Sequence, residues 1–290
     1  MRFVLSYLWW PLLMAGAIGI NAVGMQTAMP LLWLNVSYFS LAGAIFLLER
    51  AMPHERSWLA DDGQLWADIG HTLISKSAVQ ILIVAPTLIG FSGIASAEGA
   101  SWWPHGWPLA VQVVLGLVIA EFGFYWGHRL SHEVQFLWRF HAVHHSVTRL
   151  WFVNTGRFHF VDTLVSVTFG LAVGLAAGIP QEIIIWISAI TAYIGLLTHS
   201  NVEMRFGPLN YLFNTPGLHR WHHSKKLEEG NSNYGENLML FDILFGSFFD
   251  ADRRPPVDIG IREPMPATLG AQIIHPFRRV RVDGAEPETV

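Results

Sequence analysis

Most histidines of the chain fall into three regularly spaced groups. The stretch HRLSHEVQFLWRFHAVHH, residues 128–145, contains five histidines, and HRWHH, residues 219–223, contains three more. Spacings of three and four residues place side chains on one face of a helix, so each group projects its imidazoles in one direction. Imidazole is the commonest protein ligand of transition metals. The pattern predicts a metal site with eight ligands: His128, His132, His141, His144, His145, His219, His222 and His223.

The number and type of these ligands indicate which metals they bind. Eight imidazoles exceed what one tetrahedral or octahedral ion can use, so we expect two ions. The chain has no cysteine, which excludes thiolate ligands, disulfides and iron–sulfur clusters. A set of ligands rich in histidine and poor in carboxylate suits a redox-active first-row metal, and iron is the candidate for oxygen chemistry. The HExxH motif of zinc proteases is absent, because His132-Glu133 is not followed by a histidine at the required spacing.

The segments that carry these histidines are embedded in a strongly apolar chain. Of its 290 residues 52% are hydrophobic and only 14% are charged, against about 25% charged residues in soluble domains. Four apolar runs are predicted to span a membrane as helices: 3–24, 30–48, 73–95 and 107–126. Two further apolar runs, 162–178 and 182–198, are of marginal length for a hydrocarbon core of about 30 Å, so a shallow or re-entrant hairpin is as consistent with them as a full crossing.

We therefore expect an all-α integral membrane protein with about four transmembrane helices, a short hydrophobic hairpin and a cytoplasmic helical cap that carries the histidines. The chain divides into N-terminal membrane helices and loops (1–106), a catalytic region (107–250) and a C-terminal cytoplasmic tail (251–290). Lys and Arg are absent from the 96–106 loop and concentrated in 49–71, 127–160 and the C-terminal region. By the positive-inside rule, both termini and the histidine groups lie on the cytoplasmic side.

The histidine groups resemble the histidine boxes of the fatty acid hydroxylase/sterol desaturase superfamily, in the forms His128-x-x-x-His132, His141-x-x-His144-His145 and His219-x-x-His222-His223. The resemblance covers about residues 110–250. Other residues that match the superfamily are Ser146, Asn154, Arg157, Ser224, the stretches Thr198-His199-Ser200-Asn201 and Asn233-Tyr234-Gly235, and Asp242-x-x-Phe245-Gly246.

This resemblance implies a non-haem di-iron centre that uses O₂ to hydroxylate an unactivated C–H bond of a lipid drawn from the bilayer. It also implies an external electron donor, such as cytochrome b5 or a ferredoxin with an NAD(P)H reductase, since the chain has no dinucleotide fingerprint. A desaturase on the same centre is the alternative reaction, and the lipid itself is left open. No nucleic-acid partner is expected. A bacterial inner membrane is favoured over the endoplasmic reticulum, because the chain is compact and lacks cysteine.

A membrane metal-binding or metal-transport protein is the alternative from another class. Such a protein would place ligands along a path inside its spans, whereas Glu121 alone is intramembrane here. The histidines lie outside the predicted spans, which argues against transport.

The resemblance also points to ligands beyond the three boxes. His199 is expected to be a ninth ligand. Some members of the superfamily carry a further histidine four residues before it, where this chain has Gly195, so one metal would be more open or completed by water. His159 is a candidate to fill that gap, with an interfacial or supporting role as the alternative.

Four further residues are predicted to support the site. Glu121, seven residues before His128 on the same helical stripe, is a candidate to orient a ligand, with a hydrogen bond to a neighbouring helix as the alternative. Asp242 is a candidate for the same role, with capping or solvation as its alternative. Asn154 and Arg157 could contact a lipid headgroup, or simply cap a helix and reach the interface.

Overall fold

The computed structural model describes residues 2–84 and 103–278, and this part of the chain is built from helices without a strand. The predicted all-α membrane fold is confirmed. Helix α8 (Phe160–Ala176) is apolar but shorter than a full span. Four described helices are long and apolar enough to cross a membrane: α1 (Arg2–Gly24), α2 (Pro30–Ala51), α6 (Leu109–Glu133) and α9 (Gln181–Thr198).

The predicted spans correspond to these helices with two differences. Helix α9 is continuous and of spanning length, so the second run of the expected short hairpin is a candidate full crossing. The predicted span 73–95 begins within the described residues, and its part beyond residue 84 lies outside them. The described part is a chain of short helical pieces: α3 (Leu65–Gly70), π-helical His71–Lys76, α4 (Ser77–Val79) and π-helical Gln80–Val84.

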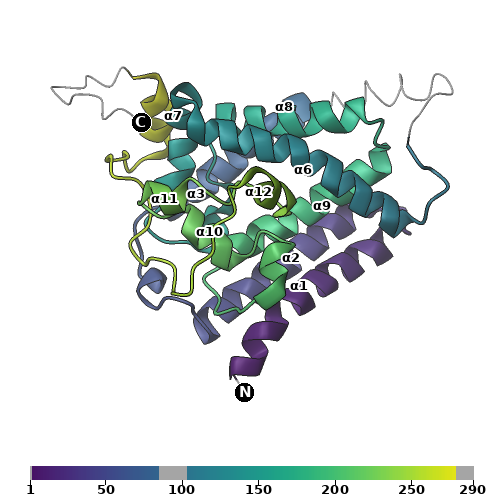
Figure 1. Cartoon of the computed structure of the whole chain (residues 1–290), viewed down its shortest axis with the longest axis horizontal. Helices are drawn as coiled ribbons and strands as arrows, with labels where there is room; N and C mark the ends of the chain where they lie inside the picture. The colour runs from purple at the N-terminus through teal and green to yellow at the C-terminus, as the bar shows by residue number, and fades with distance from the viewer. Residues whose placement is uncertain (1, 85–102, 279–290) are drawn as a thin grey trace.

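Helix α9 lies between the α1–α2 pair on one side and α6 on the other (Figure 1). Leu41 and Ile45 of α2 pack against Tyr193 and Leu197 of α9, and all four are buried. Trp186 on α9 instead belongs to the core shared with α6. Helix α9 thus contributes to both cores, and His199 follows directly at its end.

Helices α6 and α8 pack unusually closely, because glycines line their contact. A Cβ atom added to Gly123 would lie 2.3 Å from the carbonyl oxygen of Phe169, and one added to Gly170 would lie 2.2 Å from the ring of Phe124. Small residues at a helix interface allow backbones to approach, and in membranes this packing replaces the hydrophobic effect. The contact holds the first turn of α8 beside the helices that carry histidines.

Local breaks in the helical backbone determine where the histidine-bearing helices begin and end. Helix α6 continues past its apolar part through His128 and His132, and ends at Glu133 because the backbone of Val134 is extended. Helix α7 (Gln135–His145) then folds back along it. Helix α10 (Pro216–His222) begins where the Thr215 hydroxyl accepts a hydrogen bond from the Leu218 amide. Short helices α11 (Leu227–Gly230) and α12 (Leu240–Phe245) follow.

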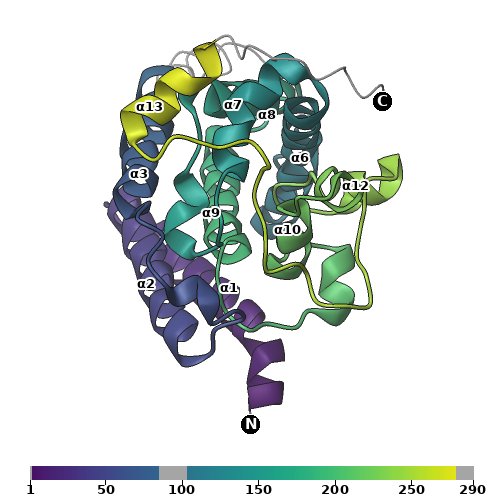
Figure 2. The same ribbon diagram turned by 90° about the vertical axis from the view of Figure 1, so that its left-hand side faces the viewer.

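The segment predicted as a C-terminal tail is packed against the helices up to residue 278. Helix α13 (Leu269–Ile274) lies beside α3 (Figure 2). The buried side chain of Gln272 is hydrogen-bonded to His71 Nε2 at 3.0 Å, and Ile259 packs with Trp58. The remaining helical turns are 3₁₀ segments at Ser57–Leu59, Phe152–Gly156, Gly207–Tyr211 and His275–Phe277.

Candidate metal centre

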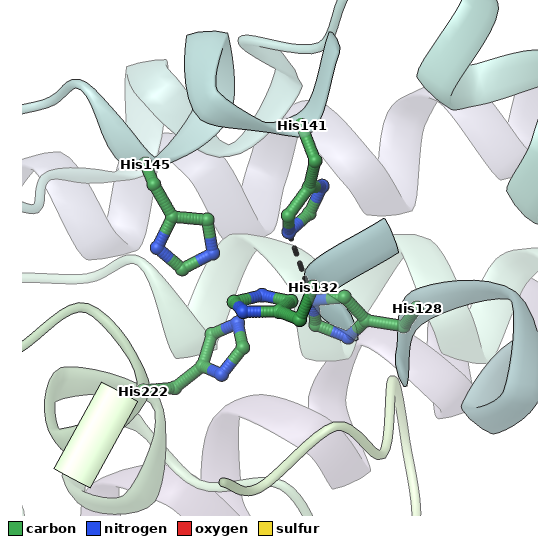
Figure 3. A group of neighbouring side chains, drawn as sticks. All are labelled: His128, His132, His141, His145 and His222. Carbon is green, nitrogen blue, oxygen red and sulfur yellow. Dashed lines mark hydrogen bonds between the residues drawn. The ribbon is translucent and has the colours of Figure 1, made fainter. Parts of the chain in front are cut away.

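Five histidines from three helices converge on one small volume (Figure 3). One ligand atom from each lies within 4.8 Å of those of the others. The Nε2 atoms of His128 and His141 are 3.1 Å apart. We call this the five-histidine group, and its members are His128 and His132 of α6, His141 and His145 of α7, and His222 of α10.

Four histidines form a second group by the same criterion, with ligand atoms again within 4.8 Å of one another. His219 Nε2 lies 2.9 Å from His199 Nε2 and 3.1 Å from His223 Nε2. We call this the four-histidine group, and its members are His144 of α7, His199 at the end of α9, His219 of α10 and His223 just after it.

The two groups are adjacent. The rings of His145 and His223 stack with centroids 4.4 Å apart, and His144 lies between His145 and His199 at about equal ring distances of 5.4 and 4.9 Å. The arrangement can therefore hold two ions side by side, each with its own ligand set.

The spacing of the nitrogen atoms suits metal binding. Two nitrogens bound to one ion at about 2.1 Å and at right angles lie about 3.0 Å apart, close to the contacts in both groups. Buried polar atoms in proteins are nearly always hydrogen-bonded, yet the Nε2 atoms of His132, His145 and His222 are buried without a partner in the part of the chain that the structure describes. These atoms belong to the five-histidine group, and a metal ion would satisfy them.

Hydrogen bonds on the outer side of the rings orient the five-histidine group. His128 Nδ1 donates to the Tyr234 carbonyl at 2.7 Å, and His222 Nδ1 donates to the Ser232 carbonyl at 2.7 Å. His141 Nδ1 lies 2.9 Å from a carboxylate oxygen of Asp162. A proton held on Nδ1 leaves the lone pair of Nε2 free to bind a metal, which is how ligand histidines are usually held.

Burial favours the neutral form, which metal binding requires, in seven of the ligand candidates. It lowers the pKa of His199 to about 3, with a further contribution from the positive charge of Lys76. Burial first, and neighbouring imidazoles second, lower the pKa of six other ligand candidates well below the usual range: His141, His144, His145, His219, His222 and His223.

The structure places Glu121 and Asp242 away from the imidazoles that they were expected to orient. Glu121 accepts hydrogen bonds from the backbone and side chain of Asn237 at 3.1 and 2.9 Å. Asp242 accepts from the amides of Tyr234 and Gly235 at 2.7 and 2.8 Å. Both carboxylates therefore hold the loop whose Tyr234 carbonyl binds His128, and their effect on the histidines is indirect.

Asn154 and Arg157 do not face a lipid headgroup. Asn154 is buried, and its side-chain oxygen accepts from His199 Nδ1 at 2.8 Å, so it orients a histidine of the four-histidine group. Arg157 is only 2% exposed and forms an ion pair with the buried Asp68 at 2.8 Å. Its guanidinium also donates to the Val143 carbonyl, which ties α7 to α3.

His159 lies outside both groups. Its Nδ1 accepts from the Val161 amide at the start of α8, and its Nε2 lies 3.1 Å from the Ile273 carbonyl of α13. Both ring nitrogens are thus occupied, and the structure does not support a ligand role. His199, by contrast, joins the four-histidine group, and Gly195 four residues earlier contributes no ligand to it.

Asp162 is a site residue that sequence reasoning missed. It is buried in the first turn of the apolar helix α8, beside His141. A carboxylate at the start of an otherwise apolar helix was the available signal. Asn231, whose side-chain oxygen is 3.2 Å from His132 Nδ1, was missed because nothing in the local sequence distinguishes it.

A cavity of about 450 Å³ lies among the membrane helices α6, α8 and α9, and Phe158 separates it from the four-histidine group. Phe158 forms part of its wall and stacks on His144 with ring centroids 4.2 Å apart. Gly195 and Thr155 line the same end, and the Thr155 hydroxyl donates to the Gly195 carbonyl. The cavity thus offers space for part of a lipid one side chain away from the candidate metal site.

Comparisons with known proteins identify related sequences. A family model described as fatty acid hydroxylase matches residues 113–247. An ornithine lipid hydroxylase of Rhizobium tropici is 50% identical over 281 residues, which covers 95% of this chain and 85% of that protein. No solved structure shows a significant match.

More distant relatives match a smaller part of the chain. The alkylglycerol monooxygenase of Homo sapiens is 33% identical over 44% of this chain and 28% of its own length. A very-long-chain aldehyde decarbonylase of Oryza sativa is 28% identical over 60% of this chain and 64% of its own length.

Proposed function

The chain belongs to the fatty acid hydroxylase/sterol desaturase superfamily, and on this basis we propose that it is a di-iron enzyme that hydroxylates an ornithine lipid. Membership makes it a metal-dependent membrane oxidoreductase that acts on lipids. The observation that carries the two-iron proposal is the separation of nine clustered histidines into adjacent groups of five and four.

Each group would hold one iron through the ring nitrogens that point inward. The five-histidine group uses its Nε2 atoms, with Asp162, Tyr234 and Ser232 holding three of the rings from outside. The four-histidine group has one ligand fewer, and Asn154 holds His199. Iron bound in these groups would supply the O₂ activation that hydroxylation of a C–H bond requires. The protein residues hold the rings in place and exclude bulk water, because nearly all of them are buried.

The proposed substrate rests on two observations. The relative that is 50% identical over almost the whole chain is an ornithine lipid hydroxylase. The cavity beside the four-histidine group is lined by residues of α6, α8 and α9, so a lipid can enter it from among the apolar helices. The hydroxylase and monooxygenase names among the relatives favour hydroxylation over desaturation.

We place the enzyme in a bacterial inner membrane with the histidine groups and both termini on the cytoplasmic side. The uneven distribution of Lys and Arg supports this orientation. Electrons would come from a separate donor, a cytochrome b5 or a ferredoxin with an NAD(P)H reductase, because the sequence has no dinucleotide fingerprint.

Isotope labelling tests the reaction. Membranes that contain the protein, an ornithine lipid and a reducing system are incubated under ¹⁸O₂, and the lipid is analysed by mass spectrometry. We expect one labelled oxygen atom per product molecule. A product that has lost two hydrogens and gained no oxygen would instead establish desaturation, and an unchanged lipid would refute the proposed substrate.

A further inference from the structure

The cavity beside the four-histidine group has a polar end and an apolar end. Its apolar walls come from the membrane helices, and its polar end lies near the π-helical segment and the loop after Tyr234. The apolar wall includes Phe124, Val167, Leu171, Ile179, Ile184 and Ile187, whereas the polar end includes Thr72, Lys76, Ser77, Thr155 and Glu236. This polarity matches that of a lipid whose headgroup points toward the histidines.

Two charged residues of opposite sign face this polar end. Lys76 and Glu236 are both half-buried, and within residues 2–84 and 103–278 neither has a hydrogen bond or an ion pair. The Lys76 ammonium lies over the Phe158 ring at 5.6 Å, and Phe158 stacks on His144. Charges that face a largely apolar cavity are costly unless they are paired. Glu236 lies near enough to stabilise the Lys76 charge in part, but within the described residues the two form no ion pair, so both remain available to a ligand that carries complementary charges.

Both residues sit on segments with fixed positions. Lys76 ends the π-helical turn that His71 begins, and such turns are frequent at functional sites. Glu236 lies between two anchored neighbours, because Asp242 accepts from the Gly235 amide and Glu121 accepts from Asn237. The same loop holds His128 through the Tyr234 carbonyl. The loop that carries Glu236 therefore also positions the ligand His128.

We propose that Lys76 and Glu236 recognise the headgroup of a zwitterionic amino-acid lipid, with Lys76 binding its carboxylate and Glu236 its ammonium group. This inference rests on the proposed function. An ornithine acylated on one amine keeps one carboxylate and one ammonium, which matches the two charges of the cavity. The acyl chains then follow the apolar wall toward the bilayer. The headgroup, rather than a chain, lies against Phe158 and so nearest the four-histidine group.

A cycle of protein variants and lipid variants tests this assignment. The kcat/KM for the ornithine lipid and for its methyl ester, which lacks the carboxylate charge, is measured with the metal-loaded wild type, Lys76→Met and Lys76→Arg in nanodiscs. Lys225→Met, which removes a lysine outside the cavity, is the matched control. The same cycle pairs Glu236→Gln with a lipid whose free amine is acetylated.

We expect esterification to lower kcat/KM by about 10- to 100-fold for the wild type, Lys76→Arg and Lys225→Met, the range of a hydrogen bond to a charged group. For Lys76→Met the penalty should shrink to less than about threefold, because the partner of the carboxylate is already gone. An equal penalty in Lys76→Met and the wild type would overturn the inference while the proposed function stands. A wild type that turns over neither lipid, although it contains iron and receives electrons, would overturn both.

Discussion

Removing the carboxylate of Asp162 should weaken iron binding in the five-histidine group alone. Asp162 accepts a hydrogen bond of 2.9 Å from His141 Nδ1, and both side chains are buried. Asp162→Ala leaves the Nδ1–H group without an acceptor and frees the ring to turn. No histidine of the four-histidine group bonds to Asp162 in the described part of the chain, so that group should keep its affinity.

The size of the effect follows from the cost of a buried donor that loses its acceptor, about 1–3 kcal/mol. This corresponds to a change in affinity of about 5- to 150-fold. Loss of an outer partner of a metal ligand typically costs about 10–100-fold. We therefore expect iron binding in the five-histidine group to weaken by about 10–100-fold. Asp162→Asn retains an acceptor oxygen and should lose only a few-fold.

Anaerobic titration of the purified protein with a competing iron chelator measures the two binding steps. In Asp162→Ala one step should move to lower affinity and the other should stay at its wild-type position. Asp252→Ala, which removes an exposed carboxylate far from any histidine in sequence, is the control. Two unchanged steps in Asp162→Ala would refute the reasoning, as would an equal loss from both.

Three further predictions concern stability. Gly123→Leu should destabilise the protein by about 1–3 kcal/mol or prevent its folding, because the Cβ atom of the new residue would lie 2.3 Å from the Phe169 carbonyl oxygen. Thermal unfolding in detergent measures this loss. An unchanged melting temperature would contradict the close α6–α8 contact. Arg157→Met leaves Asp68 buried and unpaired, so this substitution should lower the free energy of unfolding by about 3–5 kcal/mol. If Arg157 instead bound a lipid headgroup, the substitution would raise KM and leave the melting temperature unchanged. In the metal-free protein the buried histidines of α7 and α10 have a lower pKa folded than unfolded, so protons bind preferentially to the unfolded chain and stability should fall as the pH drops below about 6.5. Melting temperatures of metal-free protein from pH 8 to pH 5.5 test this, and a rise on acidification would contradict it.

The helices and the histidine clusters could be predicted because their signals are local. Long apolar runs and spacings of three and four residues depend only on the helix period. The division of the ligands into two groups could not be predicted in this way. His144 stands between His141 and His145 in sequence but is turned by about 100° from His145 around the helix axis, and joins the other group. That assignment depends on where α9 and α10 cross α7.

The supporting residues were harder to place, because each role depends on a distant partner. Glu121 was recognised as a carboxylate within a predicted span, yet its partner Asn237 lies 116 residues away. Asn154 was predicted to contact a headgroup or to cap a helix, whereas it bonds to His199, 45 residues later. Residue type indicates that such a side chain needs a hydrogen-bond partner, but only the packing of the helices decides which one it finds.

The central claim is that the chain holds two irons in separate histidine groups, and metal content tests it most directly. Protein is expressed with added iron, purified in detergent without oxygen, and compared as wild type, His132→Ala, His219→Ala and the double variant. His275→Ala, whose histidine lies outside both groups, is the control. We predict two irons per chain in the wild type and control, one in each single variant, and none in the double variant. One iron or none in the wild type, or a content that the substitutions leave unchanged, would contradict the account.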